Sequence, residues 1–478
     1  MNRYGDISPL PSAETPSGVQ SRNPLRHGRL RHGGLMRSLG VLGGAMMVLV
    51  AIGGALTTPS ALAEGSASVT AGARQSTQLV RFARALSVTT FTPPKSISDS
   101  CATDVTGALN AWFASLPKGA TVNLPSGACY LVSNSSSALL TLQDKEWLTI
   151  NGNGTTFKQD MYDDAGDPQS PVLTIGGNVA LTINNVTLIG PGSNGGWNSE
   201  GNAGILMWQN FAVRLNGVTI SGVEGDGMDV YPLGNEPGVN WYVVVDHSTI
   251  ENVGYKAIVP EAADHFTVEN STLASGDIDA EVDFSCQPPQ LPLADCGTLT
   301  GPAIGLVNMT LKNNSFPNGL ALEDEMSCMP VGNWTIEGNN FGTGGLVAQF
   351  DATYSLSLSA LQACGPQSGL TIEGNTSTDS QPPCCGAGSP YILLQGWTNV
   401  TIANNQFVYD LNQGLVGGPV VELWGDSNVA ITNNAFVNYY NLTLSDAPSG
   451  WPATTNVTTC GNTTGSAQYP VVASPCPA

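Results

Sequence analysis

A six-residue phrase recurs along most of this 478-residue chain. Its clearest copy is ITNNAF, and full or weaker copies begin at Ile150, Ile183, Leu215, Val245, Val268, Leu311, Ile336, Ile372, Ile402 and Ile431. An apolar residue opens the phrase, Asn or Gly turns the chain, and an apolar residue often closes it. Copies 23 to 43 residues apart are typical of a solenoid, in which longer intervals hold one coil plus a loop.

A second apolar run follows each phrase, and apolar and polar positions alternate within these runs. Alternation sends successive side chains to opposite faces of a strand. Asn tolerates left-handed backbone and bonds to neighbouring backbone, so we expect the asparagines to stack at turns. Many also fit N-x-S/T, which leaves glycosylation as the alternative. The chain is therefore predicted to be an all-β solenoid.

The first 63 residues have the features of a secretory signal peptide. They combine an Arg-rich start, an uncharged run from Leu39 to Leu56 and a small-residue cleavage site at Ala61 to Ala63. An uncleaved anchor is the alternative, because the run is barely long enough to span a bilayer. We predict a secreted protein that does not contact the membrane after cleavage.

Four further segments follow the predicted signal peptide. Residues 64–98 are rich in Ser, Thr, Ala and Gly and predict a flexible leader. Residues 99–146 predict an N-terminal cap with a short helix from Asp104 to Leu116, which would cover the open end of the solenoid. The coils then occupy residues 147–440, and residues 441–478 form a second cap or a loose tail.

Charge and cysteine content narrow the partners and the compartment. With a net charge of −21, the chain is a poor candidate for nucleic-acid binding, which needs Lys and Arg. The ten cysteines are even in number and lie beyond the signal, which indicates disulfides. Zinc is the alternative, but the chain has no Cys-x-x-Cys and only four histidines. The expected local pairs are Cys101–Cys129, Cys286–Cys296 and Cys460–Cys476, with Cys328, Cys364, Cys384 and Cys385 as a second group.

The stretch from Asp104 through Ala108-Leu109 and TVNLPSG (residues 121–127) to Tyr130 is similar to the opening of many polysaccharide-processing proteins. Residues 99–440 as a whole resemble the right-handed parallel β-helix of the pectin-lyase-like superfamily. The resemblance implies that fold and an extracellular polysaccharide as partner. The superfamily holds hydrolases, lyases, phage tailspikes and proteins without known catalysis, so the fold alone leaves the activity open.

Carboxylates recur in the second runs. Aligning these runs on Met228, Ile258, Ile278, Leu320 and Leu346 places acids or amides at outward positions, namely Asp229, Asp279, Glu281, Asp283, Glu323 and Gln349. Neighbouring strands lie about 4.8 Å apart and outward residues of one strand about 6.6 Å apart. Asp279 and Glu281 would then suit an inverting glycosidase, and Glu281 with Glu323 a retaining one. The alternatives are a solvated acidic face or a calcium site formed by Asp229, Asp279, Glu281 and Asp283.

Two catalytic motifs can be compared residue by residue. Polygalacturonase-type hydrolases carry Asn-Thr-Asp-Gly-x-Asp, which residues 224–229 (EGDGMD) match in part, so Asp226 would be the first catalytic Asp. Their following Asp-Asp pair is replaced by Tyr255-Lys256, and their Gly-His-Gly has no counterpart. A calcium-assisted lyase instead needs a Lys or Arg base. Lys256 is the candidate, with a counter-ion role as the alternative.

Aromatic residues complete the predicted site. Trp197, Trp208, Tyr231, Trp241 and Tyr242 cluster in sequence and suit a sugar-binding cleft, although packing under loops would also explain them. We predict a secreted polysaccharide hydrolase, with a calcium-assisted lyase and a non-catalytic glycan-binding surface or matrix protein as alternatives. No cofactor is required, and calcium is the one candidate. The predicted catalytic residues are Asp226, Asp229, Asp279, Glu281 and Lys256, and the predicted substrate-binding residues are Tyr231, Trp241, Glu323 and Gln349.

Overall fold

The structure is a computed structural model of the whole chain. The chain forms two units, Met1–Arg74 and Gln75–Ala478, and every residue that the structure describes lies in the second. The described residues are 89–132, 139–160, 170–192, 202–230, 239–260, 263–274, 277–279, 306–318, 320–323, 331–342, 346–349, 367–377, 392–408, 416–442, 451–466, 469–472 and 476.

Three sheets make up this unit. The 19-stranded sheet contains β1 (Thr90–Phe91), β2 (Ser100–Asp104), β3 (Thr121–Asn123), β4 (Cys129–Leu131), β6 (Thr149–Lys158), β8 (Val179–Ile189), β10 (Phe211–Asn216), β11 (Thr219–Ser221), β13 (Asn240–Asp246), β14 (Thr249–Glu251), β16 (Ala263–Glu269), β17 (Thr272–Leu273), β19 (Leu306–Val307), β20 (Thr310–Lys312), β22 (Gly332–Glu337), β24 (Gln367–Glu373), β26 (Trp397–Ala403), β30 (Ser427–Thr432) and β33 (Thr455–Cys460). The ten-stranded sheet contains β5 (Thr141–Gln143), β7 (Leu173–Gly176), β9 (Ile205–Trp208), β12 (Met228–Val230), β15 (Ile258–Pro260), β18 (Asp277–Asp279), β21 (Leu320–Glu323), β23 (Leu346–Gln349), β25 (Ile392–Gln395) and β29 (Val421–Trp424). The six-stranded sheet contains β27 (Gln406–Val408), β28 (Val416–Pro419), β31 (Ala435–Val437), β32 (Tyr439–Asn441), β34 (Thr463–Ser466) and β35 (Tyr469–Val472).

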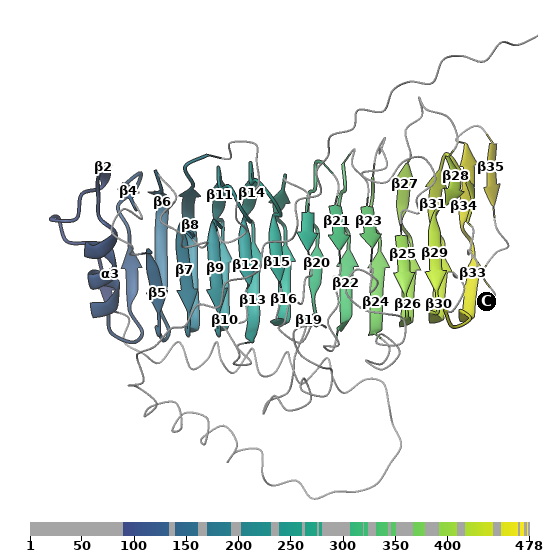
Figure 1. Ribbon diagram of the computed structural model, residues 1–478, viewed down its shortest axis with the longest axis horizontal. Helices are drawn as coiled ribbons and strands as arrows, with labels where there is room; N and C mark the ends of the chain where they lie inside the picture. The colour runs from purple at the N-terminus through teal and green to yellow at the C-terminus, as the bar shows by residue number, and fades with distance from the viewer. Residues whose placement is uncertain are drawn as a thin grey trace, which may run out of the picture. The chain divides into compact units, whose positions relative to one another are not determined.

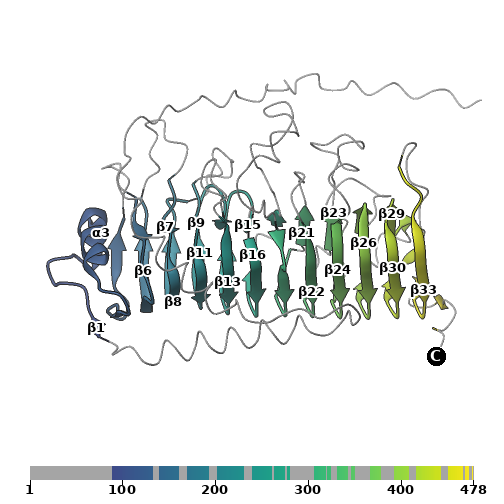
Figure 2. The same cartoon turned by 90° about the horizontal axis from the view of Figure 1, so that it is seen from below.

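The strands stack along one axis, coil after coil (Figures 1 and 2). Every strand of the two larger sheets pairs in parallel with strands of the neighbouring coils, as β10 does with β8 and β13. The antiparallel pairs, β32–β34 and β34–β35, lie at the C-terminal end. This is a right-handed parallel β-helix, and the fold predicted from the repeated phrase is confirmed.

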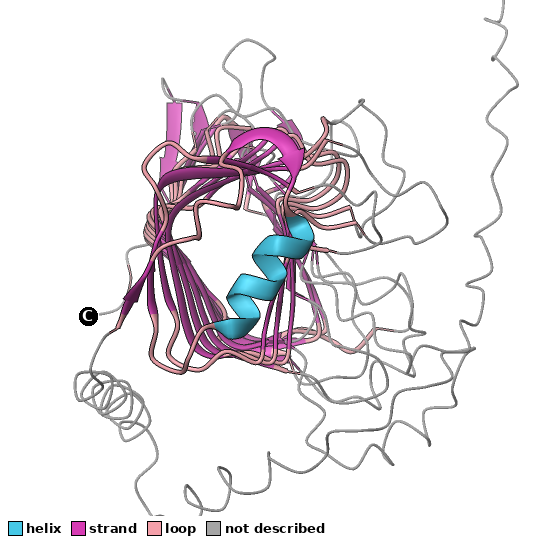
Figure 3. Cartoon of the chain, turned by 90° about the vertical axis from the view of Figure 1, so that its left-hand side faces the viewer, coloured by secondary structure: helices cyan, strands magenta, loops and turns pink. Residues whose placement is uncertain are grey.

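A helix lies across the N-terminal end of the β-helix (Figure 3). Helix α3 spans Thr106–Ser115, slightly inside the range expected from the sequence. Asp104 ends β2, two residues before the helix, and accepts hydrogen bonds from the Thr106 backbone N–H at 2.9 Å and from the Thr106 hydroxyl at 2.6 Å. Leu109 and Phe113 are buried against the first coils, and the helix thereby covers the apolar interior.

The core lies inside the coils. Residues that open and close the repeated phrase point inward, and the closing residues Phe316, Phe341, Phe407 and Phe436 are fully buried. Their rings stack along the axis, with centroids 5.6 Å apart for Phe316 and Phe341 and 6.0 Å apart for Phe407 and Phe436. The position of each phrase in the sequence therefore sets the repeat of the core.

The paired asparagines of the phrase divide two tasks between them. The first Asn, as in Asn404 and Asn433, has a positive φ (57° and 56°) and turns the chain. Gly338, Gly374 and Gly461 take this place in three coils, each with a φ of 66°. The second Asn of each pair is buried and stacks on its counterparts in the neighbouring coils; these residues are Asn314, Asn339, Asn375, Asn405, Asn434 and Asn462.

Each ladder asparagine bonds to the coils on both sides. Asn375 donates from Nδ2 to the Ile336 carbonyl oxygen at 2.8 Å and to Asn405 Oδ1 at 2.9 Å. Its Oδ1 accepts from the backbone N–H and from Nδ2 of Asn339, both at 2.9 Å. The expectation that asparagines stack at turns is confirmed.

Strand pairing continues past residue 440, where the sequence predicted the coils to end. Strand β33 pairs in parallel with β30, and the Thr463–Val472 pairing of β34 with β35 closes this end. Among the residues that the structure describes, no helix is long and apolar enough to cross a membrane.

Candidate active site

The predicted acidic positions lie in consecutive strands of the ten-stranded sheet, β12, β15, β18, β21 and β23. Asp229 pairs with Val259, Asp279 with Glu323, and Glu323 with Gln349, while Ile258 pairs with Ile278 between them. One register row therefore crosses the five strands, and its members are Asp229, Val259, Asp279, Glu323 and Gln349. We call this set the acidic row.

One part of the predicted register is wrong by two residues. Ile278 pairs with Leu322 and not with Leu320, so Glu323 lies beside Asp279. The expected match of Glu323 with Glu281 on the next coil is therefore replaced by a match with Asp279. A shift of two residues keeps every side chain on its own face of the strand. Alternation of apolar and polar residues cannot detect such a shift.

The spacing of the acidic row follows from the strand geometry. Asp279 and Glu323 are on neighbouring strands, about 4.8 Å apart along the backbone, and Asp229 is two strands from Asp279, or about 9.6 Å. Carboxyl groups about 5 Å apart suit a retaining glycosidase, and those about 6.5–9.5 Å apart suit an inverting one. The backbone of the row is compatible with a pair of acids acting on one bond.

Asp229 lies on the face opposite the core but is not open to water. Its neighbours Met228 and Val230 point into the core, with at most 1% of their surface exposed. Asp229 itself is only 5% exposed, and Leu206 and Val259, beside it in the row, are 4% exposed. The sequence predicted the direction of this side chain, whereas its burial is a finding of the structure.

Asp226 and Lys256 lie in the turns that precede β12 and β15. Asp226 Oδ1 accepts a hydrogen bond from the Lys256 backbone N–H at 3.0 Å, and the Gly227 N–H donates to the Lys256 carbonyl at 2.8 Å. Both side chains are buried, with 1% of Asp226 and 7% of Lys256 exposed. Asp226 therefore has a structural task, which is to join two consecutive coils, and its predicted catalytic role stays a prediction.

Glu224 lies close in sequence to Asp226 and Asp229 but was not among the predicted site residues. Its Oε2 accepts a hydrogen bond from Asn202 Nδ2 at 2.8 Å, and 5% of the residue is exposed. Glu224, Asp226 and Asp229 thus bring three buried carboxyl groups into six residues of chain. Buried acids need specific partners. In the sequence, the only sign of this cluster is the run of acids interrupted by glycines in EGDGMD.

Several predicted residues are described only in part. Tyr231, Glu281 and Asp283 lie outside the described residues, and for Asp279, Glu323 and Gln349 the structure describes the strand position alone. Within the described ranges, no three His, Cys, Asp or Glu side chains come together as a metal site. Because most of the proposed calcium ligands lie beyond those ranges, calcium binding stays a prediction. The lyase role of Lys256 is likewise untested.

Two of the predicted disulfides are present, Cys101–Cys129 and Cys460–Cys476. The first joins β2 to β4 beside helix α3, and the second ties the end of β33 to the C-terminal segment. The other six cysteines, Cys286, Cys296, Cys328, Cys364, Cys384 and Cys385, lie outside the described residues.

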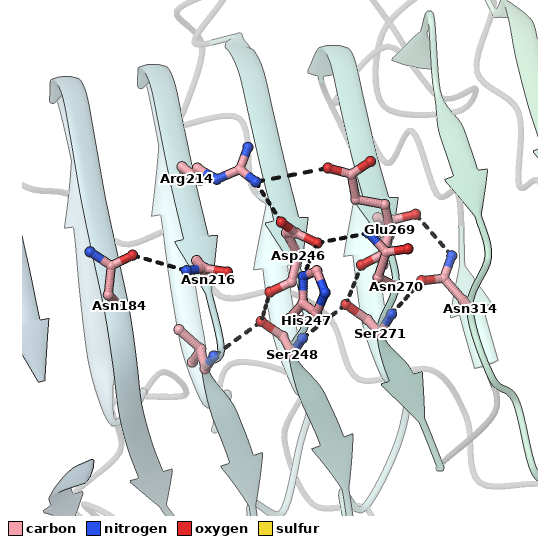
Figure 4. Close-up of polar contacts among 12 residues, drawn as sticks. Asn184, Arg214, Asn216, Asp246, His247, Ser248, Glu269, Asn270, Ser271 and Asn314 are labelled. Atoms are coloured by element: carbon pink, nitrogen blue, oxygen red, sulfur yellow. Dashed lines mark hydrogen bonds and ion pairs between the residues drawn. The ribbon is translucent and has the colours of Figure 1, made fainter. Parts of the chain in front are cut away.

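A second polar group lies on the 19-stranded sheet (Figure 4). Arg214 Nη2 lies 2.5 Å from Asp246 Oδ2 and 3.9 Å from Glu269 Oε1, and His247 Nδ1 lies 2.6 Å from Asp246 Oδ1. Asn270 Nδ2 also donates to Asp246 Oδ1, at 3.0 Å. Burial alone would raise the pKa of Asp246, but the bonds from Asn270 and His247 and the charges of His247 and Arg214 together lower it.

This polar group continues a row of asparagines. Asn216 Nδ2 donates to Asn184 Oδ1 at 3.2 Å, and Asp246 follows Asn216 in the strand register (Figure 4). Beside it, the Ser248 N–H donates to Ser271 Oγ at 3.0 Å in the place that asparagines occupy in later coils. The carboxylate of Asp246 already has three side-chain partners, so it links neighbouring coils at the surface of this sheet.

Comparisons with known proteins were made on the sequence and on the structure. No protein-family model matches the chain, and no curated protein sequence matches it. Among solved structures, it is similar to the mannuronan C-5 epimerase AlgE4 A-module of Azotobacter vinelandii, with 16% identity and a TM-score of 0.37 over 77% of this chain and 86% of that one. It is also similar to PfbA, a surface adhesin of Streptococcus pneumoniae, with 15% identity and a TM-score of 0.43 over 80% and 94% of the two chains. A third similar structure is endo-xylogalacturonan hydrolase from Aspergillus tubingensis, with 12% identity and a TM-score of 0.38 over 79% and 91%. Similarity at this level says nothing about the activity of this chain, and the fold assignment rests on the strand pairing.

Proposed function

We propose that this protein is a polysaccharide-active β-helix protein that cleaves glycosidic bonds of an extracellular glycan with a carboxylate pair, Asp279 and Glu323. The observation that supports the proposal is the pairing of these two residues on neighbouring parallel strands of the ten-stranded sheet. Asp229 occupies the same row two strands away. Acidic positions from separate coils thus share one register row, as a site for an extended chain requires.

The proposed chemistry is hydrolysis with two displacements. At a spacing of about 5 Å, one carboxylic acid protonates the leaving oxygen while the other carboxylate attacks the anomeric carbon. Water then releases the sugar, and the first residue acts as the base. The row also carries Gln349 beside Glu323, and we propose that its amide binds sugar hydroxyl groups next to the reacting bond.

A panel of neutral and acidic polysaccharides tests the proposal by release of reducing ends. Asp279→Asn and Glu323→Gln are each expected to lower the rate by a factor of about 10² to 10⁴. Glu422→Gln is the matched control, because Glu422 occupies the same register row but lies three strands beyond Glu323. Full activity in either of the first two variants would exclude the pair. Products that absorb in the ultraviolet as unsaturated sugars would favour the lyase alternative.

A second candidate function is glycan binding without cleavage. The observation that favours it is a set of half-buried aromatic side chains on the β-helix surface, among them Phe211, Trp241 and Tyr242. Retention of the protein by a polysaccharide, with no product formed on any member of the panel, would select this alternative.

We infer that the protein acts outside the cell. The two disulfides support this inference, because such bonds persist in oxidising compartments. The proposed signal peptide ends at Ala63, so the secreted protein is expected to begin at Glu64. N-terminal sequencing of protein from the culture medium tests the site, and a mature chain that retains residues 1–63 would favour the anchor.

A further inference from the structure

A column of left-handed residues runs along the 19-stranded sheet, one per coil, near the start of each strand. Its φ values lie between 54° and 81°, and its members in chain order are Trp147, Ala180, Ala212, Tyr242, His265, Asn308, Asn333, Gly369, Asn399, Asn428 and Asn456. The strand pairings on both sides place these residues in equivalent positions. From Asn308 onward, the column contains only Asn and Gly, the residues that adopt this backbone most readily.

The earlier coils carry other residues at this left-handed position, where a bulky side chain costs conformational free energy. Tyr242 and His265 have φ values of 57° and 61°, and Trp147 has one of 58°. Left-handed backbone is unfavourable for bulky side chains, and such strain is found most often at binding and active sites. Asn would satisfy the same backbone, as it does at Asn308. The backbone conformation alone therefore does not explain the aromatic side chains at these positions.

The rings form one continuous surface. The Tyr242 ring lies 5.5 Å from the Phe211 ring, at an interplanar angle of 72°, and 4.6 Å from the His265 ring, at 31°. Trp241 pairs in register with Phe211 on the neighbouring strand. All four side chains are half-buried, and 44% of the His265 side chain is exposed. We call these four residues the aromatic platform.

Small residues extend the aromatic platform toward the N-terminal end. Ala212 and Ala180 occupy the column between Tyr242 and Trp147, and both are partly exposed. Three strand steps separate the two rings, which is about 14 Å along the axis. Trp147 and Tyr242 therefore lie at the two ends of a stretch of small apolar side chains. Together they form a surface along the β-helix axis on which an extended ligand could lie.

The polar side chains beside the rings indicate which kind of ligand would bind there. Asp264 Oδ1 lies 2.6 Å from His265 Nδ1 and accepts a hydrogen bond from Asn308 Nδ2 at 2.6 Å. Among the described residues, none accepts a hydrogen bond from the Trp241 indole N–H. An acid, an amide and a free N–H suit hydroxyl groups, and the nearby carboxylate of Asp264 disfavours an anionic chain, as does the net charge of −21.

We propose that the aromatic platform is a second glycan-binding surface, separate from the acidic row, that takes the apolar faces of sugar rings in a neutral polysaccharide lying along the β-helix axis. Flat sugar faces pack on aromatic rings while their hydroxyl groups reach the polar rim. The inference deepens the proposed function, because it takes the polysaccharide ligand from it, but it requires no cleavage.

Affinity electrophoresis of the full mature chain through gels containing hydroxyethylcellulose, glucomannan or polygalacturonate tests the proposal. The wild type is expected to be retarded by one or both neutral polymers and not by polygalacturonate. Tyr242→Asn with His265→Asn should weaken the apparent affinity at least tenfold. These substitutions install the residue that later coils carry at this φ, so the thermal unfolding midpoint should not fall. Trp451→Ala is the control, since Trp451 belongs to a different aromatic pair with Trp424.

Three results would overturn the proposal. These are retardation that is unchanged in the double variant, stronger retardation by polygalacturonate than by both neutral polymers, and a dimer of the wild type that the double variant converts to a monomer. Reducing-end release from short soluble oligosaccharides separates this proposal from the proposed function. Retardation without release leaves the aromatic platform standing and removes the carboxylate pair, whereas release without retardation does the reverse.

Discussion

Asp426 offers a direct test of the energetics of this fold. It lies just before β30, is fully buried, and accepts a hydrogen bond on Oδ1 from the Trp397 N–H at 2.7 Å. Its Oδ2 is buried and has no hydrogen-bond partner among the residues that the structure describes. Burial raises the pKa of Asp426 from 3.8 to about 7, against the opposing effect of backbone hydrogen bonds from Trp397 and its neighbours. The folded protein therefore holds this acid in its neutral form at mildly acidic pH.

The dependence of stability on pH follows from that shift. Between pH 3.8 and about 7, the unfolded chain releases this proton and the folded chain keeps it. The unfolded state then binds fewer protons, so the free energy of unfolding falls as pH rises, by about 1.4 kcal/mol per pH unit. Over the whole interval Asp426 destabilises the wild type by about 4 kcal/mol, and above about pH 7 the loss is complete.

Asp426→Asn removes the titration and keeps the shape. Asn210 already makes the equivalent bond, accepting from the Asn178 N–H at 3.1 Å. The stability of the variant minus that of the wild type should grow by about 4 kcal/mol between pH 4 and pH 8. Urea unfolding followed by circular dichroism at each pH measures this difference. Asp160→Asn, at an exposed position, is the control substitution. A difference for Asp426→Asn that is the same at pH 4 and pH 8 would refute the reasoning.

Three further perturbations test other parts of the structure. Asn375→Ala removes a ladder side chain that bonds to both neighbouring coils and should lower the free energy of unfolding by about 2–4 kcal/mol in urea titrations; a loss below 1 kcal/mol would contradict the ladder's contribution. Replacing Cys101 and Cys129 by Ser opens a bridge with a sequence separation of 28 and should cost about 3–4 kcal/mol, which thermal unfolding with and without reductant measures. Asp246→Asn should cost roughly 2 kcal/mol at neutral pH. Because the pKa of Asp246 is lowered below 3.8 in the folded state, that cost should decrease as the pH falls below 3.8 and disappear once the pH is below the lowered pKa. A cost independent of pH would exclude the ion pairs as its source.

The fold could be predicted from the sequence because the repeated six-residue phrase specifies the local backbone conformation of each coil. An apolar residue, a turning Asn or Gly and a closing apolar residue specify an inward side chain, a left-handed turn and the next inward side chain. The two tasks of paired asparagines such as Asn433 and Asn434 were not separable from composition. They differ only in backbone conformation, and the structure supplies that.

The candidate site was less predictable for a physical reason. Alternation along a strand indicates the face of each side chain, so the direction of Asp229 was correct, but it gives no information on what lies over that face. Register is also ambiguous to a shift of two residues, which moved Glu323 from Glu281 to Asp279. Lys256 was expected in the acidic band and lies buried in a turn. Its backbone N–H donates a hydrogen bond to Asp226, a contact that the residue type does not reveal.

The buried asparagine ladder has a consequence for how such a protein can change in length. The bonds between its amides all run in one direction, because each Nδ2 donates to the amide oxygen of the next coil and each Oδ1 accepts from the amide of the preceding coil. The asparagine of a duplicated coil would therefore find an amide donor in the coil before it and an amide acceptor in the coil after it. The inward-facing residues would not have to change. We therefore expect this fold to accept the insertion or deletion of whole coils, for example by recombination between neighbouring copies of the phrase.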